Sequence, residues 1–138
     1  MIGLVLICHG SLAETLLKTA EEIVGPIEDV RCVSNKGKSP EVVAEEVEKA
    51  VAGFAHADGV LIMADLFGSS CWRSGLQEMH VGTNTTIPLA VLAGVNLGML
   101  LSFSQKRNAL GFRELAATMI EDGRRGISGP KFSAEVRP

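Results

Sequence analysis

The chain has 138 residues, which fits one domain with a sizeable core and leaves little room for a second. Its composition is 46% hydrophobic and 21% charged, which indicates a folded globular protein. The formal net charge of −3 disfavours a general nucleic-acid-binding protein, since such a protein presents a basic face. We therefore expect the partner to be a protein or a small anion bound at one local site.

The cysteines and the apolar segments indicate a cytoplasmic protein without a membrane span. Three widely spaced cysteines without a CxxC pair or zinc pattern are typical of buried or idle thiols in a reducing compartment. The N-terminal apolar run lacks the basic flank of a signal peptide. The long apolar stretch 86–103 contains Pro88, Gly94, Asn96 and Gly98, so it predicts a strand, a turn and a short helix.

The first element in chain order is a buried strand. Residues 2–8 form a continuous apolar run rich in β-branched side chains, which is typical of a strand covered on both faces. A helix follows, and the spacing of Ser11 and Glu14 predicts a capping box at its start. Gly25 and Pro26 end this helix.

The remaining elements continue to alternate. Further strands are predicted at 30–33, 59–64 and 87–92. Further helices are predicted from Ser39 to about Phe54, from the loop 65–70 to about Met79, and over 96–103 and 112–125. This alternation predicts an α/β fold, a three-layer sandwich with a mostly parallel central sheet and helices on both faces. The tail lacks helical periodicity, and residues 127–138 are expected to form a C-terminal arm of this single domain, 1–138.

Two polar loops are expected at the edge of the sheet where ligands usually bind. His9 follows the first strand and Asp65 follows the third, so neighbouring strands would bring the two residues together. A carboxylate that accepts from one ring nitrogen leaves the other nitrogen free to attack. The nearby helix N-terminus favours an incoming phosphoryl group. Further donors to its oxygens are predicted from Gly10, Gly68, Ser69 and Ser70.

Structural roles remain open for the same residues. A single histidine is often structural, and only the position of His9 before a glycine and a helix favours a nucleophile. Asp65 suits a loop-end turn, and Ser69 or Ser70 suits a helix N-cap. No dinucleotide, P-loop, zinc-protease or serine-hydrolase motif is present in the sequence. We therefore predict neither a metal nor a cofactor for the chemistry.

The chain resembles the mannose-type enzyme IIA domain of the bacterial phosphoenolpyruvate:sugar phosphotransferase system. The resemblance rests on LVLICHGSLAETLLKTAEEIVG at 4–25, GVLIMADLFGSS at 59–70 and VLAGVNLGML at 91–100. It implies a homodimer, often with an exchanged C-terminal strand. It also implies a histidine that is phosphorylated by the carrier HPr and hands the group to a IIB domain. The family histidine falls on His9, its aspartate on Asp65, and the phosphate-side loop on residues from Phe67 to Ser70.

The chain departs from the family pattern at three positions. Cys71 stands where proline is usual, Arg73 where asparagine is usual, and Gly98 where proline is usual. These changes preserve the nucleophile and alter the rim where partners dock, so a role in sugar uptake and a role in regulation both stay open. Contact with a membrane would be indirect, through a transporter complex.

Three alternative functions also stay open from the residues. The phosphotransferase subunit of dihydroxyacetone kinase has a related histidine, but His-Ser would be expected there in place of His9-Gly10. Small tetrapyrrole metal chelatases carry a His-Gly-Ser turn but need a second histidine in the site. A purely protein-binding module is the third alternative.

Overall fold

In the part of the chain that the structure describes, each of four strands is followed by a helix, and a fifth helix comes last. The computed structural model describes residues 1–81 and 86–134. The strands are β1 (Ile2–Cys8), β2 (Val30–Ser34), β3 (Gly59–Ala64) and β4 (Leu89–Ala93). The helices are α1 (Leu12–Val24), α2 (Pro40–Ala52), α3 (Ser70–Val81), α4 (Leu97–Lys106) and α5 (Phe112–Arg125).

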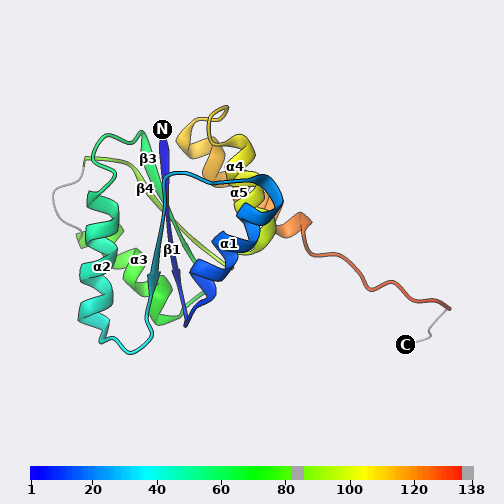
Figure 1. Cartoon of the computed structure of the whole chain (residues 1–138), viewed down its shortest axis with the longest axis horizontal. Helices are drawn as coiled ribbons and strands as arrows, with labels where there is room; N and C mark the ends of the chain where they lie inside the picture. Colours follow the sequence, from blue (N-terminus) through cyan, green and yellow to red (C-terminus); the bar gives the residue numbers. More distant parts are fainter. Residues whose placement is uncertain (82–85, 135–138) are drawn as a thin grey trace.

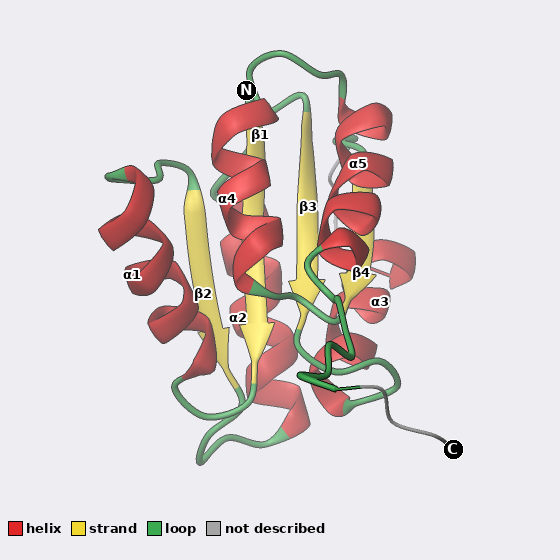
Figure 2. Ribbon diagram, turned by 90° about the vertical axis from the view of Figure 1, so that its right-hand side faces the viewer, coloured by secondary structure: helices red, strands yellow, loops and turns green. Residues whose placement is uncertain are grey.

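The strands form one parallel sheet in the order β2-β1-β3-β4. Helices α2 and α3 cover one face, and α1, α4 and α5 cover the other (Figures 1 and 2). This confirms the predicted α/β sandwich. The crossing helices are what allow all neighbouring strands to run in the same direction.

The core consists of two apolar layers, one on each face of the sheet. Alternate side chains of a strand point to opposite faces. Accordingly, Leu4 and Leu6 of β1 pack with α1, α4 and α5, whereas Val5 and Ile7 pack with α2 and α3. Every residue of β1 and β3 is buried, which explains their continuous apolar sequences.

The pairing of the two central strands positions the polar loops. Ile7 of β1 is paired with Ala64 of β3, so the chain leaves both strands at the same edge of the sheet. His9 and Asp65 therefore follow directly from a rigid, fully buried part of the fold.

The predicted capping box at Ser11 is wrong. Ser11 precedes α1 with φ −92° and ψ 9°, and its side chain makes no cap hydrogen bond. A capping serine needs an extended backbone. Here the chain enters the helix through a tight turn, in which Gly10 has φ +57° and the backbone N–H of Leu12 donates to the carbonyl of His9.

The cap predicted at Ser39 is confirmed, because Ser39 is extended and its hydroxyl accepts from the N–H of Val42 at 3.3 Å.

Several element boundaries differ from the prediction by a few residues. Strand β4 begins at Leu89 rather than 87, one residue after Pro88, which has no N–H to donate to a neighbouring strand. Helices α3 and α4 extend to Val81 and Lys106, and α2 ends at Ala52. The described part of the tail, 127–134, has no helix or strand and extends away from the sandwich (Figure 1), while 135–138 lie outside the described residues.

The apolar stretch 86–103 forms a strand, a turn and a helix, as predicted, rather than a single long helix. Within the two described segments, no helix has both the length and the apolar character needed to cross a membrane.

Candidate functional site

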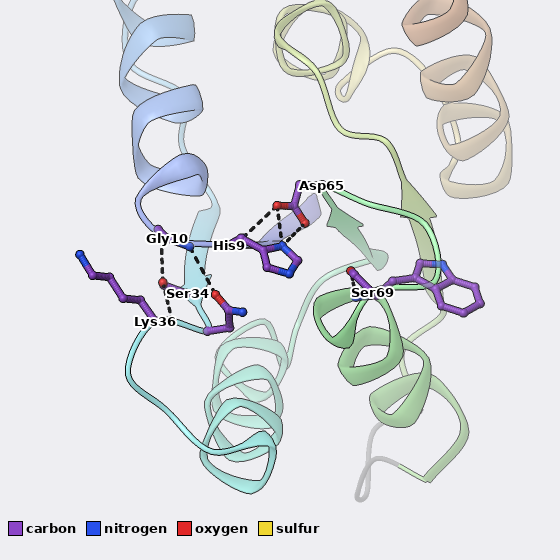
Figure 3. A network of polar contacts seen from close by, with 8 residues as sticks. His9, Gly10, Ser34, Lys36, Asp65 and Ser69 are labelled. Atoms are coloured by element: carbon purple, nitrogen blue, oxygen red, sulfur yellow. Dashed lines mark hydrogen bonds and ion pairs between the residues drawn. The ribbon is translucent and has the colours of Figure 1, made fainter.

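His9 and Asp65 meet at the carboxyl edge of the sheet, as the sequence predicted. His9 follows β1 and its side chain is 44% exposed, whereas Asp65 follows β3 and its side chain is 11% exposed. The ring Nδ1 of His9 lies 2.8 Å from one carboxylate oxygen of Asp65 and 3.0 Å from the other (Figure 3). The site thus pairs an accessible imidazole with a nearly buried carboxylate.

Asp65 fixes both the backbone and the ring of His9. The carboxylate accepts a second hydrogen bond, from the backbone N–H of His9 at 2.9 Å. Because an ionised carboxylate only accepts, Nδ1 must carry the ring proton and Nε2 must carry the lone pair in the neutral imidazole. Figure 3 shows this second ring nitrogen pointing away from Asp65. The arrangement suits a nucleophile that is held in one tautomer.

The turn that carries His9 is held from the other side by the loop after β2. The Ser34 hydroxyl donates to the carbonyl of Gly10 at 2.6 Å, and the Gly10 N–H donates to the Asn35 side chain at 3.3 Å. The N–H of Lys36 in turn donates to the Ser34 hydroxyl (Figure 3). Sequence reasoning missed Ser34 and Asn35. The signal was available, since β2 is a strand neighbouring β1 and its carboxyl end reaches the same edge.

The loop after Asp65 lines the site with exposed groups. Phe67 is 75% exposed, and Gly68 has φ +77°, a conformation that favours glycine. The hydroxyl of Ser69 accepts from the backbone N–H of Trp72 at 3.3 Å, so Ser69 caps α3, which begins at the exposed Ser70. The structural role of Ser69 is therefore observed. The role of Gly10 and of Phe67 to Ser70 in binding phosphate stays a prediction.

Two of the three cysteine thiols, Cys8 and Cys71, are buried beside the site. Cys8 and Cys71 are fully buried and Cys32 is half-buried, and all three are free. Burial, followed by the charge of Asp65, raises the pKa of Cys8 to about 12 and also raises the pKa of Cys71. Among the described residues, His9, Asp65 and Cys71 form the one group of three side chains with the donor types and spacing of a metal site.

An apolar groove runs from Asp65 along the open edge of the sheet. It has a volume of about 700 Å³ and is lined by β4, by the N-terminal part of α4 and by Ile120 and Ile127. Phe67 and Trp72 also line the groove, and their rings pack with centroids 4.7 Å apart. Arg73, one of the departures from the family pattern, follows Trp72 in the chain and is exposed on α3.

The fold and the site define an α/β protein with a histidine–aspartate pair at the carboxyl edge of a parallel sheet. A family model described as the PTS system fructose IIA component, EIIA-man, matches residues 3–120. The chain therefore belongs to the mannose family of IIA components of the sugar phosphotransferase system, as the sequence resemblance indicated.

Individual relatives agree with this assignment. The mannose-specific EIIAB component of the phosphotransferase system of Escherichia coli K12 is 32% identical over 136 residues. That match covers 94% of this chain, and the chain spans only 40% of the length of the relative. The Shigella flexneri protein of the same name matches equally well.

Solved structures show the same fold at lower identity. A phosphotransferase system component EIIA from Streptococcus agalactiae has a TM-score of 0.81 at 24% identity, covering 94% of this chain and 97% of its own. A mannose/sorbose-specific IIA subunit from Enterococcus faecalis has a TM-score of 0.80 at 23% identity, covering 97% and 98%.

Proposed function

We propose that His9 accepts a phosphoryl group from phospho-HPr on Nε2 and passes it to a IIB domain. The observation that carries this proposal is the bond between Nδ1 and Asp65, which leaves the other nitrogen of an exposed ring free. Membership of the IIA family supports the reaction class. The sugar, and the choice between uptake through a membrane transporter and regulation in the cytoplasm, would be set by the IIB partner.

The transfer needs no group beyond those at the sheet edge. The Nε2 lone pair attacks phosphorus as the bond from phosphorus to the donor nitrogen breaks, and the donor imidazole keeps that electron pair. Asp65 holds the Nδ1 proton and balances the positive charge that forms on the ring. Phosphoryl transfer depends mainly on alignment and charge placement, which a fixed ring supplies.

The phosphoryl oxygens would be received by backbone and hydroxyl donors. Helix α1 begins at Leu12, three residues after His9, and the N–H groups of a first helical turn favour anions. We assign the remaining contacts to Gly10 and to the loop from Phe67 to Ser70, whose left-handed Gly68 exposes its backbone.

Phosphate uptake tests the proposal directly. Incubated with phosphoenolpyruvate, enzyme I and HPr, the protein should gain one phosphate that is labile in acid and stable in base. His9→Ala should abolish the uptake. The matched control is His56→Ala, which removes an exposed histidine far along the chain. Uptake by His9→Ala at the wild-type rate would refute the proposal.

We further propose that the chain forms a C₂ homodimer through its C-terminal arm. Strand β4 lies at the open edge of the sheet, and the groove beside it is apolar. Ile127 and Phe132 of the arm are 80% and 63% exposed, so they lack an apolar environment within one chain. An isologous contact of this kind would bury both features at once.

A further inference from the structure

The nucleophile of the proposed reaction lies in a cluster of three different metal-ligand types. A ring nitrogen of His9, a carboxylate oxygen of Asp65 and the Sγ atom of Cys71 all lie within 4.8 Å of one another. Each comes from a separate segment, namely the end of β1, the end of β3 and the first turn of α3. The spacing of these residues in the sequence therefore did not indicate a metal site, and only the fold brings them together.

The positions of the three donors match those of an open metal site. Cys71 is fully buried and the Asp65 side chain is 11% exposed, so these two form a fixed floor. The His9 ring is 44% exposed, so it is the solvent-accessible member of the three. Three protein ligands with solvent on one side leave a fourth position open, as in zinc sites that bind water or substrate.

The distances and the charges fit Zn²⁺. Tetrahedral zinc with bonds of about 2.0–2.3 Å places its ligand atoms roughly 3.5 Å apart. The donor atoms lie at most 4.8 Å apart, so the longest separation has to close by about 1.3 Å, which requires the His9 ring to leave its hydrogen-bonded position against Asp65. A thiolate and a carboxylate together carry two negative charges, which a divalent cation neutralises. Imidazole and thiolate nearby favour Zn²⁺ over Mg²⁺ or Ca²⁺.

We propose that His9, Asp65 and Cys71 bind one Zn²⁺ ion and that the bound ion blocks phosphoryl acceptance. The thiol of Cys71 loses its proton to solvent when its sulfur binds the metal. The metal binds Nδ1 of His9 and an oxygen of Asp65 in place of the hydrogen bond that orients the ring, and the Nδ1 proton moves through solvent to Nε2, which then has no free lone pair. Zinc binding and phosphorylation of His9 then exclude each other.

This inference depends on Cys71, which supplies the third ligand atom. Cys71 stands where the family pattern usually has proline, which offers no ligand atom. The binding of Zn²⁺ is independent of the proposed function, whereas the blocking effect rests on it. Two separate measurements therefore test the two parts.

Titration with Co²⁺ tests the binding. Co²⁺ takes zinc sites, and a thiolate bound to it gives intense near-ultraviolet charge-transfer absorption, so the ligand can be identified in the wild-type protein itself. We expect this band to saturate at one equivalent and to disappear when Zn²⁺ is added. Cys71→Ala should remove the band and weaken binding by more than about 10-fold, since loss of even a group that only orients a ligand costs roughly 10–100-fold. Cys32→Ala removes a thiol outside the cluster, so this variant should keep both the absorption band and the wild-type affinity for the metal.

The binding part is overturned if wild-type protein shows no thiolate band, or if the band persists in Cys71→Ala and disappears in Cys32→Ala. Because the first criterion uses the unmodified chain, a folding defect of the variant cannot decide the result.

Transfer from previously isolated phospho-HPr tests the blocking effect. One equivalent of Zn²⁺ should slow transfer to the wild-type protein at least tenfold, and a zinc-selective chelator should restore the rate. The ratio of rates without and with Zn²⁺ should fall to about one in Cys71→Ala. An unchanged rate in wild-type protein that shows the thiolate band overturns the blocking effect alone. Transfer that never occurs, even without metal, contradicts the proposed function and leaves the binding result intact.

Discussion

At the scale of single residues, the site depends on one carboxylate with two tasks. Asp65 accepts from the backbone N–H and from the ring Nδ1 of His9, so it fixes both the turn and the side chain. Its side chain is 11% exposed, which leaves little water to replace either bond.

We predict that Asp65→Asn slows phosphoryl transfer by roughly 10²-fold, the scale for a misplaced reacting group. The amide keeps the shape of the carboxylate and one acceptor oxygen, but it replaces the other oxygen by a donor NH2 group and cannot balance the imidazolium charge. Rapid-quench measurement of transfer from phospho-HPr gives the rate, and circular dichroism checks folding. If the folded variant transfers at the wild-type rate, Asp65 has only a structural role in the turn.

At the scale of elements, two serines that look alike in sequence differ in what they do. Ser39 is extended and caps α2, whereas Ser11 lies in a tight turn and makes no cap bond. The sequence pattern of a capping box is local, and it contains no information on the turn that Gly10 imposes.

Replacing each serine by alanine measures this difference. Ser39→Ala should lower the free energy of unfolding by about 1 kcal/mol, because the N–H of Val42 loses its acceptor. Ser11→Ala should change the free energy of unfolding by only about 0.3 kcal/mol, which lies within the range of ordinary surface substitutions. Urea denaturation of both variants gives the comparison, and an equal loss at the two positions would contradict the observed caps.

A second element-scale feature is an acidic groove between α2 and α3. Glu41, Glu45 and Glu48 of α2 face Glu78 of α3 across it, and Glu78 is only 7% exposed. Burial raises the pKa of Glu78, and the charge of Glu48 raises it further. The folded chain therefore holds this proton more tightly than the unfolded chain does.

It follows that ionised Glu78 opposes folding at neutral pH. The free energy of unfolding should fall as the pH rises from the ordinary carboxyl pKa through the raised pKa of the folded chain. Glu78→Gln should remove that dependence, raising the Tm at pH 7 with little change in acid. Thermal denaturation across this pH range is the measurement, with the exposed Glu45→Gln as control. A lower Tm for Glu78→Gln at pH 7 would show that the charge is compensated.

Much of the fold and the central pair could be predicted because both follow from strong local patterns. The buried strands β1 and β3 read as continuous apolar runs, and parallel pairing then requires His9 and Asp65 to share an edge. The contribution of Ser34 and Asn35 was missed because it depends on how the loop after β2 folds back onto Gly10. Cys71 was predicted only as a change at the rim where partners dock, because its approach to the pair is set by where α3 begins.

At the scale of the whole molecule, the open edge and the exposed arm predict assembly. The edge strand β4 and its apolar groove would remain exposed in a monomer, an arrangement that natural proteins usually cover. Light scattering at micromolar concentration should report about twice the chain mass of 14.6 kDa. Truncation after Gly126 should shift the protein toward the monomer. A wild-type monomer would eliminate the proposed dimer and leave the chemistry at His9 unaffected.

The central claim is that Asp65 holds Nδ1 of His9 so that Nε2 receives the phosphoryl group. The most direct measurement is nitrogen NMR of ¹⁵N-labelled histidine before and after transfer from phospho-HPr, with His9→Ala used to assign the ring. We expect phosphorus to couple to Nε2, while Nδ1 keeps its proton. Coupling to Nδ1, or to a ring other than that of His9, would contradict the account.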